Sequence, residues 1–289
     1  MALFKNIFSE TKMLDFKIQK ESCTRCGECV ADCPARIIAM ADDGYPFIAT
    51  EKEGNCYRCQ HCLAICPNGS ISIFGLDPAE SIALTGGYPD PVSLETLIKG
   101  RRSVRRYKSE NLDPELFQRL LDVAWNAPTG VNSRQVRFTV LDSKEKMAQF
   151  RDEVMAGLGK IVKESTLPAG MEYYTNFVKI WEKHHVDLLF RDAPHLLVAS
   201  APKRVASPVQ DCLIALSYFD LFAQANGVGT VWNGLVYKAI SDLLPLSRQR
   251  LGIPDDHVIG YAMVFGKPDV HFVRTVQHTP ALIHRALEE

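Results

Sequence analysis

The sequence has 289 residues, of which 46% are apolar, so it can bury the core of one or two domains. Its 33 basic and 34 acidic residues give a net charge of −1, which argues against a nucleic-acid-binding protein. No apolar run reaches the roughly 18 residues that a membrane span needs, and the start lacks the apolar stretch of a signal peptide. We therefore expect a soluble, cytoplasmic protein that binds neither nucleic acid nor membrane.

Eight of the nine cysteines fall within one N-terminal stretch, and the ninth, Cys212, stands alone far along the chain. The eight form two runs of the pattern C-x2-C-x2-C-x3-C-P, and each cysteine of the first run recurs 33 positions later. Such a regular repeat indicates two copies of one small structural unit. An even number of cysteines would also allow disulfides, but local clustering without an export signal favours metal binding.

The spacing of these cysteines suits an iron–sulfur cluster better than zinc. Two-residue gaps let three thiolates converge on three corners of a cubane, while the fourth cysteine lies beyond a helical turn and points away. Structural zinc sites use two CxxC pairs and need neither the third close cysteine nor the following proline. Residues 16–75 resemble bacterial-type two-cluster ferredoxins along their whole length. This resemblance implies two [4Fe–4S] clusters with crossed ligation, one bound by Cys23, Cys26, Cys29 and Cys66, the other by Cys56, Cys59, Cys62 and Cys33.

The chain after the cysteine repeat is predicted to contain a linker and a second domain. Residues 76–91 are rich in proline and glycine and read as the linker, and residues 92–289 form the domain. A helix is expected from Asp113 onward, because an N-capping aspartate precedes a proline there. The further expected elements are a strand at 136–141, helices at 143–158 and 176–190, a strand at 195–201, a helix at 208–226, a strand at 257–265 and a tail from 267 to 289.

Three motifs in the second domain occur together in a known order. Residues 101–107, RRSVRRY, follow the pattern R-[RH]-S-x-[RK]-x-[FY]. Residues 128–138, PTGVNSRQVRF, are similar to P-[ST]-x-x-N-x-Q-P-W-x-F, although Val136 and Arg137 replace the usual Pro-Trp pair. Residues 227–234, GVGTVWNG, are similar to GLGS-x-W-x-G. Through these motifs, about residues 92–275 resemble the nitroreductase family.

The resemblance implies an α+β fold, with a mixed sheet covered by helices, and a homodimer that builds an FMN pocket from both chains. Arginine forks pair well with phosphate, so an arginine run fits the FMN phosphate. The alternative, a solvated or nucleic-acid-binding basic patch, is disfavoured by the near-zero net charge. The residues expected to contact FMN are Arg101, Arg102, Ser103, Arg105, Thr129, Asn132, Gln135, Asn233, Gly234 and Arg274. No catalytic side chain stands out.

Together, the two resemblances imply an FMN-dependent oxidoreductase with its own electron inlet. Electrons from a ferredoxin-type donor or NAD(P)H would enter through the clusters, and a nitro compound, quinone or similar organic acceptor would receive a hydride from FMN N5. A bound nicotinamide is not expected, because no GxGxxG motif in a βαβ context is present. One alternative is an electron-transfer relay whose flavin serves a partner protein. Another is a flavin-destroying or dehalogenating branch of the same superfamily.

Overall fold

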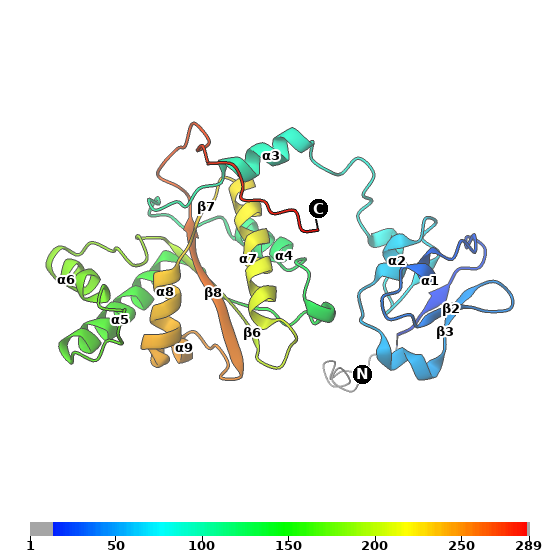
Figure 1. Cartoon of the computed structure of the whole chain (residues 1–289), viewed down its shortest axis with the longest axis horizontal. Coiled ribbons are helices and arrows are strands. Elements are labelled where there is room, and N and C mark those ends of the chain that lie inside the picture. The colour runs from blue at the N-terminus through cyan, green and yellow to red at the C-terminus, as the bar shows by residue number, and fades with distance from the viewer. Residues whose placement is uncertain (1–13, 288–289) are drawn as a thin grey trace. The chain divides into compact units, whose positions relative to one another are not determined.

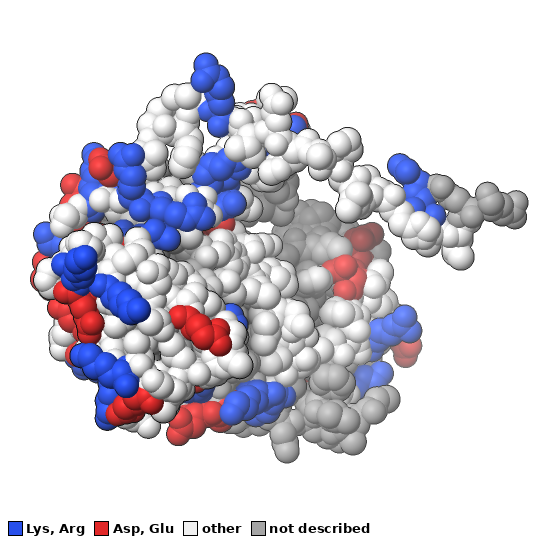
Figure 2. Space-filling model, turned by 60° about the vertical axis from the view of Figure 1, so that its left-hand side comes forward, with Lys and Arg blue, Asp and Glu red and all other residues white. Residues whose placement is uncertain are grey.

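The computed structural model describes residues 14–287. The chain forms two compact units, and we describe each by itself (Figure 1). Of the described residues, the N-terminal unit comprises 14–88 together with Thr129–Arg134, and the C-terminal unit comprises Pro89–Pro128 and 135–287. Within residues 14–287, no helix is long and apolar enough to cross a membrane. Charged side chains of both signs lie on the face shown in Figure 2.

The N-terminal unit is built from two short two-stranded antiparallel sheets and two short helices. Strand β1 (Lys17–Ile18) pairs antiparallel with β4 (Ile71–Ser72), and β2 (Ile38–Met40) pairs antiparallel with β3 (Pro46–Ile48). The helices are α1 (Glu28–Ala31) and α2 (His61–Ile65), and the 3-10 turns are η1 (Thr50–Asn55) and η2 (Pro78–Glu80). A small core of Leu14, Ile37, Ile38, Leu63, Ile71 and Ile73 surrounds the buried Cys29 and Cys62.

The sequence repeat of this unit is also a repeat of backbone conformation. Gly27 and Gln60 precede the two helices at equivalent positions, and both have left-handed backbones, with φ of 80° and 61°. Arg25 and Arg58, also equivalent, have φ of 58° and 55°. The two cysteine loops therefore fold alike, although only one of the four positions carries the glycine that favours this conformation.

The C-terminal unit contains a four-stranded sheet in the order β5-β6-β8-β7. These strands are β5 (Arg137–Leu141), β6 (His195–Pro202), β7 (Gly229–Trp232) and β8 (His257–Gly266), and all their pairings are antiparallel. A parallel bridge joins Ser103 to Thr230, so the arginine run adds a parallel contact at the β7 edge. Every residue of β6 is buried, which shows that helices cover both faces of the sheet.

Two apolar cores lie on the two faces of this sheet. On one face, Leu196 and Val198 pack with α5 (Lys144–Lys163), α6 (Tyr174–His184) and α8 (Gly234–Lys238). On the other face, Leu197 and Ala199 pack with α4 (Pro114–Ala124) and α7 (Pro208–Ala225). Successive residues of β6 alternate between the two cores, as the pleat of a strand requires. The resulting three layers form the expected α+β fold, with α3 (Pro91–Gly100) beside α7 (Figure 1).

Most of the predicted elements are found, with differences that have local causes. Helix α6 ends at His184, six residues before the predicted end, because His185 adopts a left-handed backbone with φ of 53°. Helix α5 continues to Lys163, beyond the predicted end. The sequence did not predict α3, β7, α8, the π-helical turn η4 (Ala239–Leu243) or α9 (Pro245–Arg250). Apart from α3, these elements are four to six residues long and show little periodicity of their own.

Gly229 at the start of β7 is expected to tolerate no side chain. A Cβ atom placed there would lie 2.6 Å from a methyl group of Val104, which is itself only 4% exposed. We expect Gly229→Ala to lower the free energy of unfolding by about 1–3 kcal/mol, because a well-packed site must shift to admit a methyl group. Gly100→Ala is the matched control, since a Cβ there meets nothing within 4 Å. Urea denaturation that showed equal stability for both variants would contradict this prediction.

Candidate cluster and flavin sites

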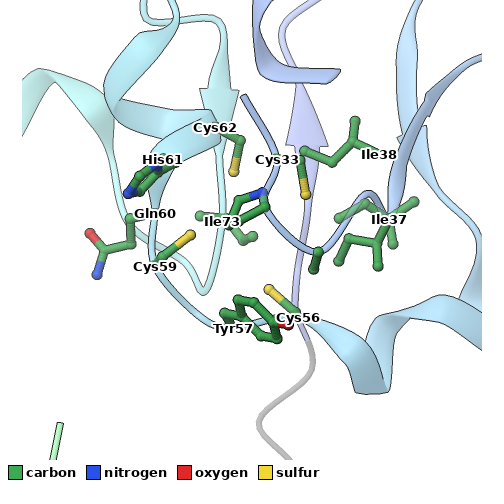
Figure 3. A pocket seen from close by; sticks show the side chains of 13 residues that line it. Cys33, Ile37, Ile38, Cys56, Tyr57, Cys59, Gln60, His61, Cys62 and Ile73 are labelled. Carbon is green, nitrogen blue, oxygen red and sulfur yellow. The ribbon is translucent and has the colours of Figure 1, made fainter. Parts of the chain in front are cut away.

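One cavity of the N-terminal unit is lined by four cysteines (Figure 3). Three of them, Cys56, Cys59 and Cys62, come from the second run, on the loop before α2 and on α2 itself. The fourth, Cys33, comes from the first run, just after α1. The four sulfur atoms point toward a common space, and the isoleucine side chains Ile37, Ile38, Ile48 and Ile73 contribute to the wall. This is one of the crossed sets that the cysteine spacing predicts.

A second cavity of the same unit is lined by the other four cysteines of the two runs. Cys23, Cys26 and Cys29 from the first run line it together with Cys66 from the second. Cys26 is exposed, whereas Cys29 is buried in α1. The structure thus brings each predicted set of four cysteines together around its own cavity.

The chemistry of both cavities fits a cluster of several iron atoms. Backbone N–H groups of Arg58 and Ser70 donate to the sulfurs of Cys56 and Cys66 over 3.4 and 3.2 Å, as suits anionic sulfur. Among residues 14–287, no three His, Cys, Asp or Glu side chains are placed to hold a single ion. Four thiols arranged around a cavity suit a cubane, which takes one thiolate at each iron atom.

Burial makes metal binding by these thiols dependent on proton release. Burial raises the pKa of the Cys62 thiol to about 12, and it also raises the pKa values of the Cys29 and Cys56 thiols. In the cluster-free unit these side chains are therefore protonated near neutral pH. Iron must displace the protons when it binds, so cluster assembly is coupled to proton release.

In the C-terminal unit, the arginine run is attached to the edge of the sheet. Arg101 follows the last residue of α3, and the backbone N–H of Val104 donates to the Thr230 carbonyl over 2.8 Å. The Arg102 Nη1 donates to the Arg101 carbonyl over 2.6 Å, whereas its buried Nε has no hydrogen-bond partner among the described residues. A buried guanidinium nitrogen without an acceptor is costly. An anionic ligand at this run would supply one.

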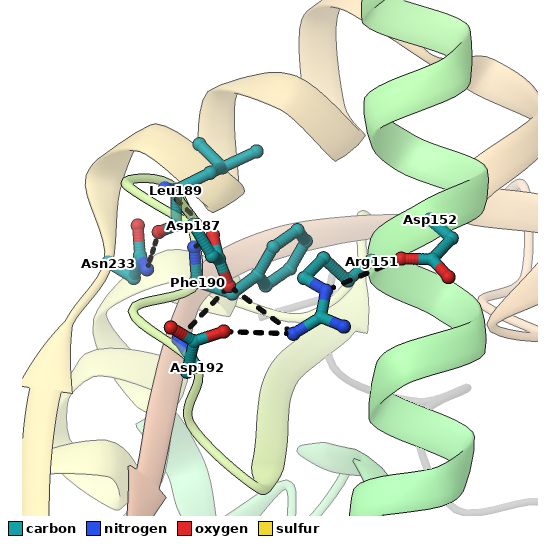
Figure 4. Close-up of polar contacts among 7 residues, drawn as sticks. All are labelled: Arg151, Asp152, Asp187, Leu189, Phe190, Asp192 and Asn233. Atoms are coloured by element: carbon teal, nitrogen blue, oxygen red, sulfur yellow. Dashed lines mark hydrogen bonds and ion pairs between the residues drawn. The ribbon is translucent and has the colours of Figure 1, made fainter. Parts of the chain in front are cut away.

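Asn233 of the third motif belongs to a network of polar contacts (Figure 4). Asn233 caps α8 by accepting from the Val236 N–H over 2.9 Å, and its amide donates to the Leu189 carbonyl over 2.8 Å. The loop that carries Leu189 is in turn fixed by the fully buried Asp187 carboxylate, which accepts from the backbone N–H groups of Leu189 and Phe190. Both polar atoms of the Asn233 side chain therefore have partners within the fold, and its backbone N–H donates to the Ala262 carbonyl over 2.9 Å.

Gly234 lies close to a tyrosine side chain of its own unit. A Cβ atom at this position would lie 2.8 Å from the Tyr261 hydroxyl. Tyr261 also stacks on Tyr237, with ring centroids 5.0 Å apart and an interplanar angle of 13°. The glycine of the third motif therefore has a packing role that the motif alone does not reveal.

The second motif is divided between the two units. Thr129 and Asn132 belong to the N-terminal unit, where Thr129 Oγ1 accepts from the Arg134 N–H and the Asn132 amide donates to the Tyr57 carbonyl over 2.9 Å. Gln135 belongs to the C-terminal unit and accepts from Arg204 over 2.9 Å. Val131, Asn132 and Arg134 all have positive φ, so the segment follows a strained path without glycine at these positions.

The remaining two predicted flavin contacts are exposed. Arg105 lies in the arginine run, and Arg274 lies in residues 270–287, which form no helix or strand. Their role at a flavin site stays a prediction.

Comparison with known protein families identifies both units. Residues 98–267, more than half of the chain, match the model of the Nitroreductase family. The chain belongs to the nitroreductase family. Residues 22–71 match the 4Fe-4S dicluster domain, so this nitroreductase-family chain carries a ferredoxin domain as well.

Two curated relatives match about half of this chain or somewhat more. A protein of Methanothermobacter thermautotrophicus, named as an NADH dehydrogenase/NAD(P)H nitroreductase, is 29% identical over 171 residues, 58% of this chain and 72% of its own length. Iodotyrosine deiodinase of Thermotoga neapolitana is 28% identical over 138 residues, 48% of this chain and 72% of its own length.

Solved structures of nitroreductases share the fold of the C-terminal unit. One from Desulfitobacterium hafniense, with bound FMN, is 26% identical, has a TM-score of 0.51 and matches 66% of this chain and 98% of its own. Another from Bacteroides fragilis is 18% identical with a TM-score of 0.54, over the same shares of the two chains, and supports the fold alone.

Proposed function

We propose that this chain is an FMN-dependent oxidoreductase that receives electrons through two [4Fe–4S] clusters and passes them to a small organic acceptor. The observation that carries the proposal is the pair of cavities, each lined by four cysteines drawn from both runs, in a chain whose larger unit belongs to the nitroreductase family. Crossed ligation by two such runs is the arrangement of two-cluster ferredoxins, whose clusters carry single electrons. A cluster domain joined to a nitroreductase domain therefore suits an electron inlet.

FMN is the cofactor that the C-terminal unit fits. Nitroreductase structures from this family contain it, and the unpartnered Arg102 Nε marks a place for an anion such as its phosphate. We assign Arg101, Arg102, Ser103 and Arg274 to the phosphate, and Arg105 to the edge of the flavin where a cation stabilises negative charge. The other proposed contacts are Thr129, Asn132, Gln135, Asn233 and Gly234. When bound, FMN accepts single electrons and releases two as a hydride, chemistry that no side chain here supplies.

Anaerobic titration tests the proposal directly. Protein purified without oxygen should hold about eight iron, about eight sulfide and one FMN per chain, as two four-iron clusters and one flavin require. After reduction by a ferredoxin-type donor or by NAD(P)H, at least one of a nitroaromatic, a quinone and an activated alkene should reoxidise the flavin. Stoichiometric zinc without sulfide would refute the clusters. Reoxidation only by a protein acceptor would favour the electron-relay alternative.

A homodimer is the assembly that we expect. Helix α3 buries none of its residues, and Val92 and Val273 are both 70% exposed. The tail that follows β8 also exposes Phe272, Val276, Leu282 and Ile283. Exposed apolar segments need a covering surface, and a two-fold copy is the commonest source. Light scattering should give twice the chain mass of 32.3 kDa.

Two aspartate variants test where the copies meet. Val273→Asp should shift the protein toward monomer at micromolar concentration, because a charge would be buried at the interface. Leu246→Asp is the matched control, since Leu246 is 75% exposed on α9 and should leave the mass unchanged. A flavin-loaded wild-type monomer would contradict the expected dimer.

A further inference from the structure

Helix α7 carries a buried carboxylate, Asp220, on the side that faces the arginine run. Asp220 is only 4% exposed and lies among apolar residues such as Phe219 and Ala223. Burying a carboxylate costs several kcal/mol unless donors and a counter-charge compensate it. A residue of this kind in a core helix therefore points to specific partners.

The partners of Asp220 come from two segments that lead to the predicted flavin contacts. Its Oδ1 accepts a short hydrogen bond from the Thr230 hydroxyl, and its Oδ2 accepts from the Trp232 indole N–H over 2.9 Å. The same Oδ2 lies 3.6 Å from Nη1 of Arg101. Thr230 and Trp232 hold the carboxylate in place with two neutral donors, and Arg101 supplies the positive charge.

The arrangement leaves Arg101 able to bind a second anion. The Arg101 side chain is 31% exposed, whereas that of Asp220 is 6% exposed. A guanidinium has five N–H donors in a rigid fork, and the ion pair with Asp220 approaches it at Nη1. Within residues 14–287 the guanidinium has no other hydrogen bond or ion pair, so its remaining donors can meet an anion. Because a free arginine side chain loses rotamer entropy when a ligand fixes it, holding it in advance favours ligand binding.

We propose that Asp220 is a positioning residue that holds Arg101 ready for the phosphate of FMN. This inference rests on the proposed FMN function and adds to it a residue outside the three flavin motifs. Asp220 also binds β7, whose end leads into Asn233 and Gly234. One carboxylate thus connects the residue assigned to the phosphate, Arg101, with the segment that leads to the proposed contacts Asn233 and Gly234.

A double-mutant cycle separates positioning from general support of the fold. FMN and riboflavin dissociation constants are measured by fluorescence quenching for apo-flavin forms of the wild type, Asp220→Asn, Arg101→Ala and the double variant. Asn keeps the size of Asp and can still accept from the Trp232 indole N–H while its amide donates to the Thr230 hydroxyl oxygen, but it removes the charge that holds Arg101. We expect Asp220→Asn to weaken FMN binding by about five- to tenfold, within the range of coupling between contacting residues. In the Arg101→Ala background the same change should have no effect, and riboflavin, which lacks the phosphate, should bind all four proteins alike.

Trp232→Phe provides a second test if Asp220→Asn does not fold. It removes the indole donor to Oδ2 but keeps the carboxylate and an aromatic ring, and it should weaken FMN binding less, again with riboflavin unaffected. FMN affinity that is unchanged or improved in Asp220→Asn would overturn the inference, as would an equal loss for riboflavin or in the Arg101→Ala background. If Arg101→Ala weakens FMN binding while Asp220→Asn does not, the inference about Asp220 fails and the proposed function still stands. A wild type that binds no FMN would overturn the proposed function itself.

Discussion

Replacing Cys26 by alanine is expected to remove most of the turnover that a ferredoxin-type donor drives. Cys26 lines one of the two cysteine cavities, and it is exposed, so its loss disturbs the core of the N-terminal unit least. Iron should fall from about eight to about four atoms per chain, because a cubane that lacks one of its four thiolates is not retained. Donor-driven turnover should fall by at least about tenfold, equal to about 1.4 kcal/mol in the barrier.

The flavin chemistry itself should survive in Cys26→Ala. When the flavin is reduced chemically, acceptor reduction should match the wild type, since that step needs only the C-terminal unit. Cys212→Ala is the matched control, because Cys212 is a buried thiol of α7 that lines neither cysteine cavity. This control should keep its iron and its donor-driven rate. A folded, cluster-deficient Cys26→Ala protein with the wild-type rate would show that the clusters are structural and would end the electron-inlet proposal.

Arg101→Ala is expected to give the largest loss of FMN affinity among the variants of the arginine run. Removing a charge-assisted contact to phosphate costs on the order of 1.5–3 kcal/mol, which corresponds to roughly a 10- to 150-fold rise in the dissociation constant. Equilibrium dialysis or fluorescence titration of the apo-flavin protein measures the FMN dissociation constant. Riboflavin affinity should change little, because riboflavin offers no phosphate to the arginine.

Arg106→Ala serves as the control for charge removal from the same run. The Arg106 side chain is 70% exposed and donates to the Asp269 carbonyl, and it is not among the predicted flavin contacts. Its loss should change FMN affinity by less than about twofold, as expected for a screened surface charge. Equal effects of the two substitutions would mean that the run attracts FMN only through its summed charge. FMN occupancy that is unchanged in Arg101→Ala would remove this residue from the site.

The sequence determined those features that depend on local spacing. Each cysteine run carries its spacing within about a dozen residues, and the resemblance of the two runs to two-cluster ferredoxins implied both crossed sets that line the cavities. Longer segments were likewise predictable, because α4 records its buried face in its own periodicity and β6 is a nearly continuous apolar run. The order of the three flavin motifs sufficed to predict the family, which the family comparison shows.

Only the tertiary structure decided which partners the polar residues have. In the sequence Asp220 is one acid in an apolar helix, and its contacts with Arg101, Thr230 and Trp232 join three separate segments. Asn233 was predicted to contact flavin, but its side chain caps α8 and bonds to Leu189, which lies 44 residues away. Asn132 likewise donates to Tyr57, 75 residues away. Such contacts leave no periodic signal, because a hydrogen bond between distant segments depends on how the chain packs rather than on the residues beside it.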